Sequence, residues 1–291
     1  MLHTIRNNFL SVTISEEMAQ LQSILGADGT EYLWQGDPKY WAKRAPNLFP
    51  YVGRLNGGSY YLDGERYEMK IHGIAPYRNF TLVSKEQTKL VFALLSDEET
   101  LRQYPREFAF RVVYELQEHT LTITYEVENR DHRTLLFGLG AHPGFNVPMA
   151  PGLTFEDYRA RFTEASHPTL IHFDRNGLRD QQDRPYEMEQ GTTIPLSHDL
   201  FENDAIVLKD VCREVTLESS ADSHAVTVSF PQMRYVGLWH MPHTDAPYVC
   251  IEPWCSLPAL AGVDTVFEQQ PDLLTAAPGE TYRNAWSITV R

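Results

Sequence analysis

Much of this chain alternates between apolar and polar residues with a period of two, and very little of it follows the period of a helix. The alternation is clearest in residues 108–116 (FAFRVVYEL) and 120–129 (TLTITYEVEN), which the turn Gln117-Glu118-His119 joins. This pattern is typical of strands with one buried face, and the short turn between the two runs predicts a hairpin. We therefore expect antiparallel sheets rather than the strand–helix alternation of an α/β fold.

Shorter strand-like runs fill most of the remaining chain and are separated by glycine-containing turn dipeptides. The further strands predicted are residues 60–62, 66–71, 90–95, 135–139, 206–208, 215–218, 225–230, 234–239, 248–252 and 284–290. One short helix is expected to begin at the capping box Ser96-Asp97-Glu98-Glu99 and to reach about Tyr104. Many short antiparallel strands predict an all-β protein, a large sandwich or barrel. No repeat or linker interrupts the pattern, so residues 1–291 are expected to form a single domain.

The charge and the composition argue against several classes of partner. The 291 residues carry a formal net charge of −14 and no cluster of Lys and Arg, which argues against nucleic acid. No apolar run approaches the ~18 residues needed to cross a bilayer, and the N-terminus lacks the apolar core of a secretory signal. The three cysteines, Cys212, Cys250 and Cys255, have no metal-ligand spacing. We expect a cytoplasmic monomer or homodimer, with no membrane, metal or cofactor, that binds a small neutral molecule.

Two residues suited to proton transfer stand directly before prolines in strand-like runs. His142 lies in residues 138–145 (GLGAHPGF), and Glu252 lies in residues 248–254 (YVCIEPW). A residue before proline favours an extended backbone, so both side chains should project from rigid segments. An imidazole and a carboxylate held in this way can act as a general acid/base pair. His142 and Glu252 are therefore the candidate catalytic residues, although the sequence alone does not show that they meet.

Each of these residues also has a plainer interpretation. In an extended segment Gly138, Gly140 and His142 share one face, on which the glycines would clear space beside the imidazole. The alternative is that the glycines allow close backbone packing and that His142 is an ordinary histidine. An outward-pointing Glu252 is most often simply hydrated. The adjacent Trp254 favours a ligand site, because its ring offers a flat apolar face to a sugar, but it suits a hydrophobic core equally well.

Three further polar residues are candidates for ligand binding. Arg54 follows Gly53 in a turn-rich segment and is suited to donate hydrogen bonds to sugar hydroxyl groups. His72 ends a predicted strand, and Asp204 precedes one, where its carboxylate is suited to accept hydrogen bonds from neighbouring hydroxyls. Judged singly, each residue has a simpler role: a surface ion pair, a histidine at the end of a turn and an Asx turn, respectively.

In chain order, these segments resemble the aldose 1-epimerase (galactose mutarotase) family, and within it a bacterial branch of epimerase-like proteins. The resemblance extends over nearly the whole chain. It rests on residues 31–38 (EYLWQGDP), 46–50 (PNLFP), 53–54 (GR), 72–73 (HG), 141–146 (AHPGFN) and 252–254 (EPW). It implies an antiparallel β-sandwich of the galactose mutarotase type and an isomerase that interconverts the α and β anomers of a free aldose.

The resemblance also implies a role for each candidate residue. His142 is the general acid that protonates the ring oxygen, and Glu252 is the general base that removes the proton of the anomeric hydroxyl. Arg54, His72 and Asp204 match sugar-binding positions. For this mechanism Glu252 must be ionised and His142 protonated when the sugar binds, and a neighbouring carboxylate would help to keep the histidine charged.

Three other functions fit the sequence less well. A hexose-6-phosphate mutarotase has the same fold and acid/base pair but needs a basic pocket, which the net charge disfavours. The candidates for that pocket are Lys70, Arg78 and Arg44. A glycoside-processing enzyme would use two carboxylates, such as Asp204 and Glu252. A non-catalytic sugar-binding module would keep the cleft without turnover. Asn203, the neighbour of Asp204, is the alternative match to the sugar-binding position that is assigned above to Asp204.

Overall fold

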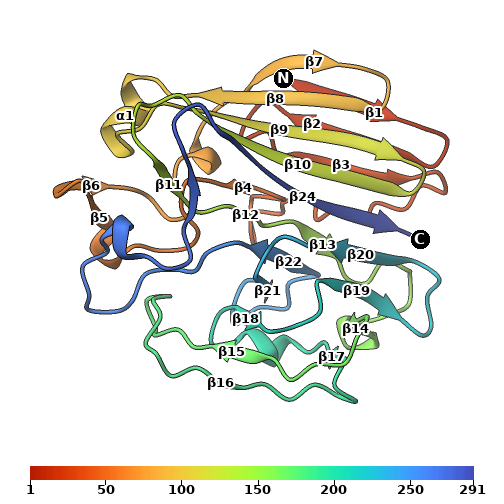
Figure 1. Ribbon diagram of the computed structural model, residues 1–291. Coiled ribbons are helices and arrows are strands. Elements are labelled where there is room, and N and C mark those ends of the chain that lie inside the picture. The colour runs from red at the N-terminus through yellow and green to blue at the C-terminus, as the bar shows by residue number, and fades with distance from the viewer.

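The computed structural model describes residues 1–291 and consists mostly of antiparallel strands (Figure 1). The largest sheet has nine strands, in the order β17 (Thr193–Pro195), β14 (Tyr158–Phe162), β19 (Glu214–Ser219), β20 (Ala225–Ser229), β24 (Thr281–Val290), β10 (Thr120–Asn129), β9 (Phe108–Gln117), β8 (Lys89–Leu95) and β7 (Thr81–Lys85). An eight-stranded sheet has the order β16 (Arg184–Pro185), β15 (Thr169–Ile171), β18 (Ile206–Lys209), β21 (Tyr235–Trp239), β22 (Tyr248–Trp254), β12 (Gly140–Ala141) and β4 (Asn47–Leu48), with β13 (Gly144–Asn146) also paired to β22. The predicted all-β, antiparallel class is confirmed.

Smaller elements complete the structure. They are a three-stranded sheet of β1 (Leu2–Arg6), β2 (Leu10–Ser15) and β3 (Leu21–Gly26), the pair β5 (Ser59–Leu62) with β6 (Glu65–Glu68), and the pair β11 (Leu135–Phe137) with β23 (Leu274–Ala276). The helices are α1 (Glu98–Gln103) and the 3-10 turns η1 (Asn56–Gly58), η2 (Ala75–Tyr77), η3 (Phe155–Asp157), η4 (His198–Phe201) and η5 (Phe267–Gln269). None of these helices has the length and apolar character that crossing a membrane requires.

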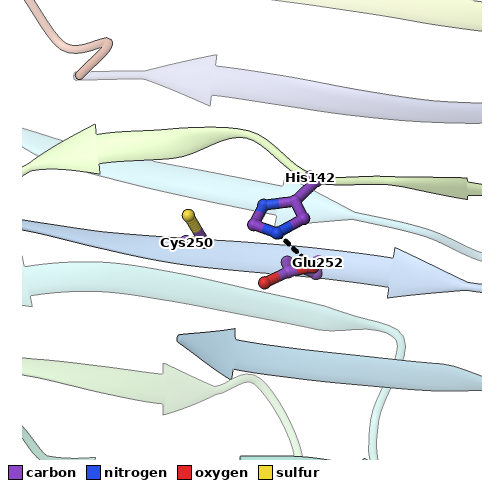
Figure 2. A group of neighbouring side chains, drawn as sticks. All are labelled: His142, Cys250 and Glu252. Atoms are coloured by element: carbon purple, nitrogen blue, oxygen red, sulfur yellow. Dashed lines mark ion pairs between the residues drawn. The ribbon is translucent and has the colours of Figure 1, made fainter. Parts of the chain in front are cut away.

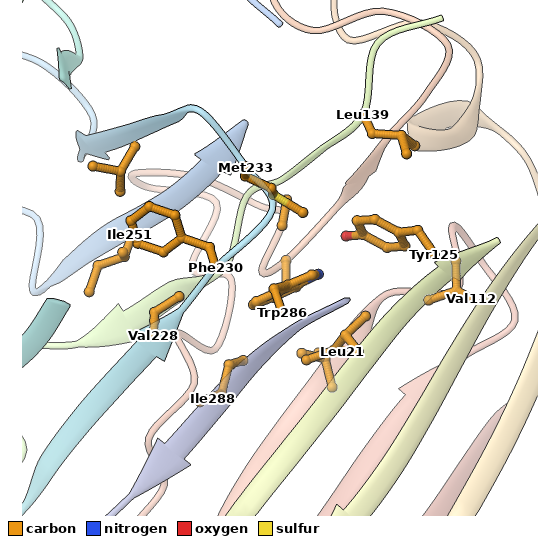
Figure 3. Close-up of a cluster of buried hydrophobic side chains, with 14 of the residues drawn as sticks. Leu21, Val112, Tyr125, Leu139, Val228, Phe230, Met233, Ile251, Trp286 and Ile288 are labelled. Carbon is orange, nitrogen blue, oxygen red and sulfur yellow. The ribbon is translucent and has the colours of Figure 1, made fainter. Parts of the chain in front are cut away.

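The hydrophobic core joins the two large sheets (Figure 3). A single cluster of 65 buried residues includes Tyr125 and Trp286 from the nine-stranded sheet and Ile251 from the eight-stranded sheet. The sequence of β10 explains how a strand contributes to it, because its residues alternate strictly between half-buried and buried positions. Successive side chains of a strand point to opposite faces, so every second residue of β10 enters the core.

The predicted hairpin and the predicted helix both form, with one change at the helix cap. β9 and β10 pair along their whole lengths around the predicted turn. α1 begins one residue later than the capping box suggests, because Asp97 and not Ser96 is its N-cap. The Asp97 carboxylate accepts a hydrogen bond from the backbone N–H of Thr100 at 2.8 Å. The Ser96 hydroxyl instead accepts the backbone N–H of Phe108, at the start of β9.

Several strand boundaries also differ from the prediction. β6 ends at Glu68 rather than at residue 71, and β11 ends at Phe137 rather than at residue 139. β22 runs on through Pro253 to Trp254, so Glu252 lies inside a strand and not at its end. The alternation does not predict β1 to β3 or most of the two- and three-residue strands.

Candidate functional site

Two side chains suited to acid/base chemistry meet in the centre of the eight-stranded sheet (Figure 2). His142 lies in the short link between β12 and β13, and both of these strands pair with β22. Glu252 lies within β22, opposite Gly237 of β21. Nε2 of His142 is 3.2 Å from Oε2 of Glu252. Strand pairing therefore holds together two residues that lie far apart in the sequence.

A cavity of about 320 Å³ lies beside this pair. All six residues predicted for the site line it: Arg54, His72, His142, Asp204, Glu252 and Trp254. Asn203 is not part of the lining, so of the two alternatives at that position Asp204 is the one that reaches the cavity. Much of the remaining wall is aromatic or apolar and includes Trp41, Tyr77, Phe173, Trp239 and Met241. A polar centre within an apolar wall is typical of small-molecule sites.

Burial governs the charge of the central pair. His142 and Glu252 are only 8% and 1% exposed. Burial, reinforced by the negative charge of Asp204, raises the pKa of Glu252 well above its ordinary value. Burial, reinforced by the repulsion between the protonated forms of His142 and His72, lowers the pKa of His142 well below its ordinary value. A pair that holds one proton therefore keeps it on the carboxyl group, and the expectation that a neighbouring carboxylate keeps His142 charged is wrong, because desolvation dominates.

The backbone around His72 fixes the proton position on its ring. His72 and Gly53 both have a positive φ, 64° and 75°. Nδ1 of His72 accepts a hydrogen bond from the backbone N–H of Gly53 at 3.1 Å. Burial lowers the pKa of His72 to about 3, so the imidazole is neutral near pH 7. Its single ring proton is then on Nε2, which leaves His72 with one hydrogen bond to donate.

Asp204 is oriented by a residue that the sequence did not single out. Nε1 of Trp239 donates a hydrogen bond to Oδ1 of Asp204 at 2.7 Å. Asp204 has a positive φ of 76°, which holds it at the turn before β18. Its carboxylate makes no bond of the Asx-turn kind and is directed to the indole instead. The only sequence signal for Trp239 is its place at the end of a predicted strand.

Trp41, which the sequence analysis also missed, covers the imidazole of His142. The two rings stack with centroids 4.8 Å apart and planes inclined by 27°. The carbonyl oxygen of Trp41 accepts a hydrogen bond from Nε1 of Trp34 at 2.9 Å, which ties this loop residue to its neighbours. Trp239 approaches the same imidazole edge-on at 5.4 Å. Local sequence gives no signal for these contacts, because they depend on the path of the loop.

Trp254 combines the two roles considered for it. It is only 5% exposed and belongs to a small apolar cluster, yet it also borders the cavity. The glycines before His142 serve this packing. A Cβ on Gly140 would lie 2.9 Å from Cδ1 of Trp254, and one on Gly138 would lie 2.3 Å from Oγ of Ser256. Of the two interpretations that the sequence left open for these glycines, the structure therefore supports close packing of neighbouring segments.

The thiol of Cys250 lies close to the acid/base pair (Figure 2). Its sulfur, one ring nitrogen of His142 and one carboxylate oxygen of Glu252 all lie within 4.8 Å of one another. These three donor types can in principle share a metal ion. Burial, reinforced by the charge of Glu252, raises the pKa of the Cys250 thiol well above its ordinary value. The thiol is therefore protonated near neutral pH, and binding a metal would require the loss of that proton.

Comparison with known proteins gives one consistent family. The sequence model of the aldose 1-epimerase family matches residues 1–289. The plasmid-encoded protein LacX of Lactococcus lactis subsp. lactis is 32% identical over 294 residues, which covers 98% of both chains.

Solved structures agree with this match. A galactose mutarotase related enzyme from Lactobacillus acidophilus is 32% identical, with a TM-score of 0.94 over 100% of this chain and 97% of that one. A galactose mutarotase-like protein from Lactobacillus casei ATCC 334 is 29% identical, with a TM-score of 0.95 over 100% of both chains. These similarities confirm the predicted β-sandwich of the galactose mutarotase type.

Proposed function

Because the chain belongs to the aldose 1-epimerase family, we propose that it is a mutarotase, an isomerase that interconverts the α and β anomers of an aldose. The observation that carries the proposal is the 3.2 Å contact between His142 and Glu252 at the wall of the cavity. A sugar ring has two oxygens bonded to C1, the ring oxygen and the anomeric hydroxyl. A proton donor and a proton acceptor this close together can serve both oxygens at once.

The reaction requires one proton to leave the anomeric hydroxyl and one to reach the ring oxygen. Protonated His142 donates to the ring oxygen, while ionised Glu252 accepts the proton of the hydroxyl. The bond between C1 and the ring oxygen breaks, and C1 becomes the carbonyl carbon of the open-chain aldehyde. Rotation about the C1–C2 bond and the reverse proton transfers then close the ring on its other face.

The pair holds one proton throughout this cycle. Before ring opening the proton is on His142, and Glu252 is charged; after ring opening the imidazole is neutral and Glu252 carries the proton. Burial favours the second arrangement. Hydroxyl groups of the bound sugar donate hydrogen bonds to Glu252, which stabilises the carboxylate of the first arrangement. Bound sugar thus brings the two states closer in energy, which suits a reaction that runs in both directions.

The other lining residues position the sugar. His72 donates a hydrogen bond from Nε2, Arg54 donates from its guanidinium group, and Asp204 accepts hydrogen bonds from neighbouring hydroxyls. Trp254 adds an apolar edge against the C–H surface of the ring. Each step of this mechanism moves only protons between the sugar and the two catalytic side chains, so the mechanism itself calls on neither a metal nor a cofactor.

Saturation-transfer NMR on a panel of aldoses measures anomer exchange directly. We expect His142→Asn and Glu252→Gln each to lower turnover by about 10²–10⁴-fold, the range for loss of one general acid or base. Glu115→Gln, at an exposed position of β9, is the control and should exchange anomers like the wild-type protein. Circular dichroism of each variant checks that the fold is retained.

The outcomes separate the alternatives. Exchange at the wild-type rate in either catalytic variant would contradict the assigned roles. If the wild-type protein binds aldoses without accelerating exchange, it is a non-catalytic sugar-binding module. Release of reducing ends from an oligosaccharide would instead identify a glycoside-processing enzyme.

A further inference from the structure

The cavity carries more positive than negative charge, although the whole chain has a net charge of −14. Lys43 and Arg54 both line it. Neither forms an ion pair, because no carboxylate oxygen lies within 4.0 Å of a side-chain nitrogen of either residue. On the negative side, Asp204 contributes one charge, and the pair of His142 and Glu252 is neutral overall when it holds one proton. The field of a distant surface charge is screened over about 8 Å at physiological salt, so the local charges decide which ligand is favoured here.

Lys43 is the less expected of the two cations. It is half-buried, and its ammonium group lies 4.7 Å from the ring centroid of Tyr77, which also lines the cavity. The ammonium of Lys70 lies 4.9 Å from the same ring and adds further positive charge there. A partly buried cation loses hydration, and an aromatic face replaces only part of that loss. The negative charge of the exposed Glu17 acts on Lys43 without forming an ion pair with it, so an anionic group on the ligand would supply the close partner that the ammonium lacks.

The charges around the acid/base pair show on which side of the sugar this partner belongs. The positive charge of Lys43 contributes to the low pKa of both His72 and His142. The negative charge of Asp204 contributes to the high pKa of Glu252, for which Lys43 is not among the causes. The contacts of Tyr77 place Lys43 in the same way. The hydroxyl of Tyr77, the ring beneath the Lys43 ammonium, donates a hydrogen bond to the carbonyl oxygen of Ile71, and the ring of the next residue, His72, lies 5.6 Å from that of His142. Lys43 therefore lies on the side of His142. In the proposed mechanism, His142 faces the ring oxygen and Glu252 faces the anomeric hydroxyl.

The ring oxygen of a pyranose is bonded to C1 on one side and to C5 on the other, and C5 carries C6. We propose that the substrate is an aldose with an anionic group on C6, a phosphate ester or a carboxylate, and that the ammonium of Lys43 binds this group. The inference rests on the proposed mutarotase function and names the substrate class of the same site.

Two of the residues that the sequence suggested for a phosphate are engaged elsewhere. The guanidinium of Arg78 is paired with Asp97 and Glu99. Arg44 donates its hydrogen bonds to Gln22 and Gln35. Neither arginine lines the cavity, whereas Lys70 stands at its Tyr77 rim. We therefore assign the binding of the anionic group to Lys43, which no sequence pattern identified.

The test compares anomer exchange of glucose, glucose 6-phosphate and glucuronate by saturation-transfer NMR, with the spontaneous rate of each sugar measured in the presence of the Glu252→Gln variant and subtracted. We expect the wild-type kcat/KM to be at least about tenfold higher for one of the anionic sugars than for glucose, which is the size of one charge-assisted hydrogen bond. The better of the two anionic sugars identifies the group as phosphate or carboxylate. In Lys43→Met this preference should fall by about 10–100-fold. Lys85→Met, on the exposed strand β7, removes the same charge away from the cavity and should keep the preference.

Each outcome has one meaning. A wild-type protein that exchanges glucose as fast as both anionic sugars overturns the inference and leaves the mutarotase function intact. An anionic preference that survives in Lys43→Met overturns the role of this lysine. If the wild-type protein accelerates none of the three sugars, and none of a wider panel, then the proposed function fails and the inference fails with it.

Discussion

The imidazole of His142 is positioned mainly by aromatic rings. Its Nδ1 has no hydrogen-bond partner in another residue, while Trp41 stacks on one face and Trp239 meets it edge-on. An aromatic face attracts a cation, so Trp41 stabilises the imidazolium form that donates the proton. Burial disfavours that same form. The activity of His142 therefore depends on the balance between desolvation and this stacking.

Replacing Trp41 should affect turnover more than binding. We expect Trp41→Ala to lower kcat about tenfold, because a desolvated cation–π contact is worth up to roughly 2 kcal/mol. Trp41→Phe retains an aromatic face and should stay within about threefold of the wild-type kcat. Separate kcat and KM values from anomer-exchange kinetics check this prediction. A raised KM with unchanged kcat in Trp41→Ala would show instead that Trp41 only binds the sugar.

The sequence identified the residues of the site that stand in recognisable local contexts. His142 and Glu252 precede prolines, and Arg54 follows a glycine of positive φ. Trp41 and Lys43 stand in no such context, because their contacts arise when a loop folds over the cavity from another part of the chain. The sequence also could not predict which residue of the pair holds the proton, because burial decides this and burial depends on the assembled sheets.

Among the strands, β12 and β22 meet close to the acid/base pair. Gly140 of β12 lies opposite Trp254 of β22 and opposite Leu48 of β4. The absence of a side chain at Gly140 lets the indole pack against the backbone there. This contact sits two residues from both catalytic side chains, so the register of three strands and the geometry of the pair depend on one glycine.

Adding one methyl group at this position should therefore destabilise the protein. In Gly140→Ala the new Cβ would lie 2.9 Å from Cδ1 of Trp254. We expect the free energy of unfolding, measured by urea denaturation, to fall by about 1–3 kcal/mol, the usual cost of overpacking. Exchange activity should fall too, because the clash displaces β22. The double variant Gly140→Ala/Trp254→Phe, with a smaller ring, should regain part of the stability, and no recovery would show that the strain lies elsewhere.

Strand periodicity predicted the longer elements well and the shorter ones poorly. β9 and β10 each run for ten residues, long enough for the alternation to be unmistakable, whereas β24 begins at Thr281, three residues before the predicted strand. Strands of two or three residues, such as β4 and β12, contain too little pattern to read, and only pairing with their neighbours defines them. The helix cap moved from Ser96 to Asp97 because β9 uses the serine hydroxyl, which is a tertiary contact.

At the scale of the whole molecule, the sequence predicted the class of the fold but not the pairing of distant strands. β10 pairs with β24, and the eight-stranded sheet brings β4 beside β12 and β22. These partners lie far apart in the chain, and alternation shows which face of a strand is buried without showing what covers it. The β-sandwich was predicted instead from the six motifs that resemble the mutarotase family, because members of one family share a fold.

The same long-range assembly joins the N-terminal region to the strands of the C-terminal half through His224. Its Nδ1 lies 2.7 Å from Oδ1 of Asp222, and its Nε2 lies 2.9 Å from Oδ2 of Asp28, beyond the end of β3. Hydrogen bonding to Asp28, more than to Asp222, raises the pKa of His224 above 6.5. Contact with Thr30 and His224 lowers the pKa of Asp28 to about 2. The charged bridge is thus complete at mildly acidic pH.

This bridge predicts how stability depends on pH. A group with a raised pKa in the folded state contributes stability that is fully present below its unfolded pKa, near 6.5, and is lost as the pH rises through the folded pKa. We therefore expect His224→Gln to be less stable than the wild-type protein at pH 5.5, and the difference to shrink by pH 8.5. The difference should stay below about 1 kcal/mol, because Asp28 is half exposed and such pairs are screened by solvent. Urea denaturation at both pH values, with the exposed His167→Gln as control, measures it; a difference that grows with rising pH would show that His224 is held in its neutral form.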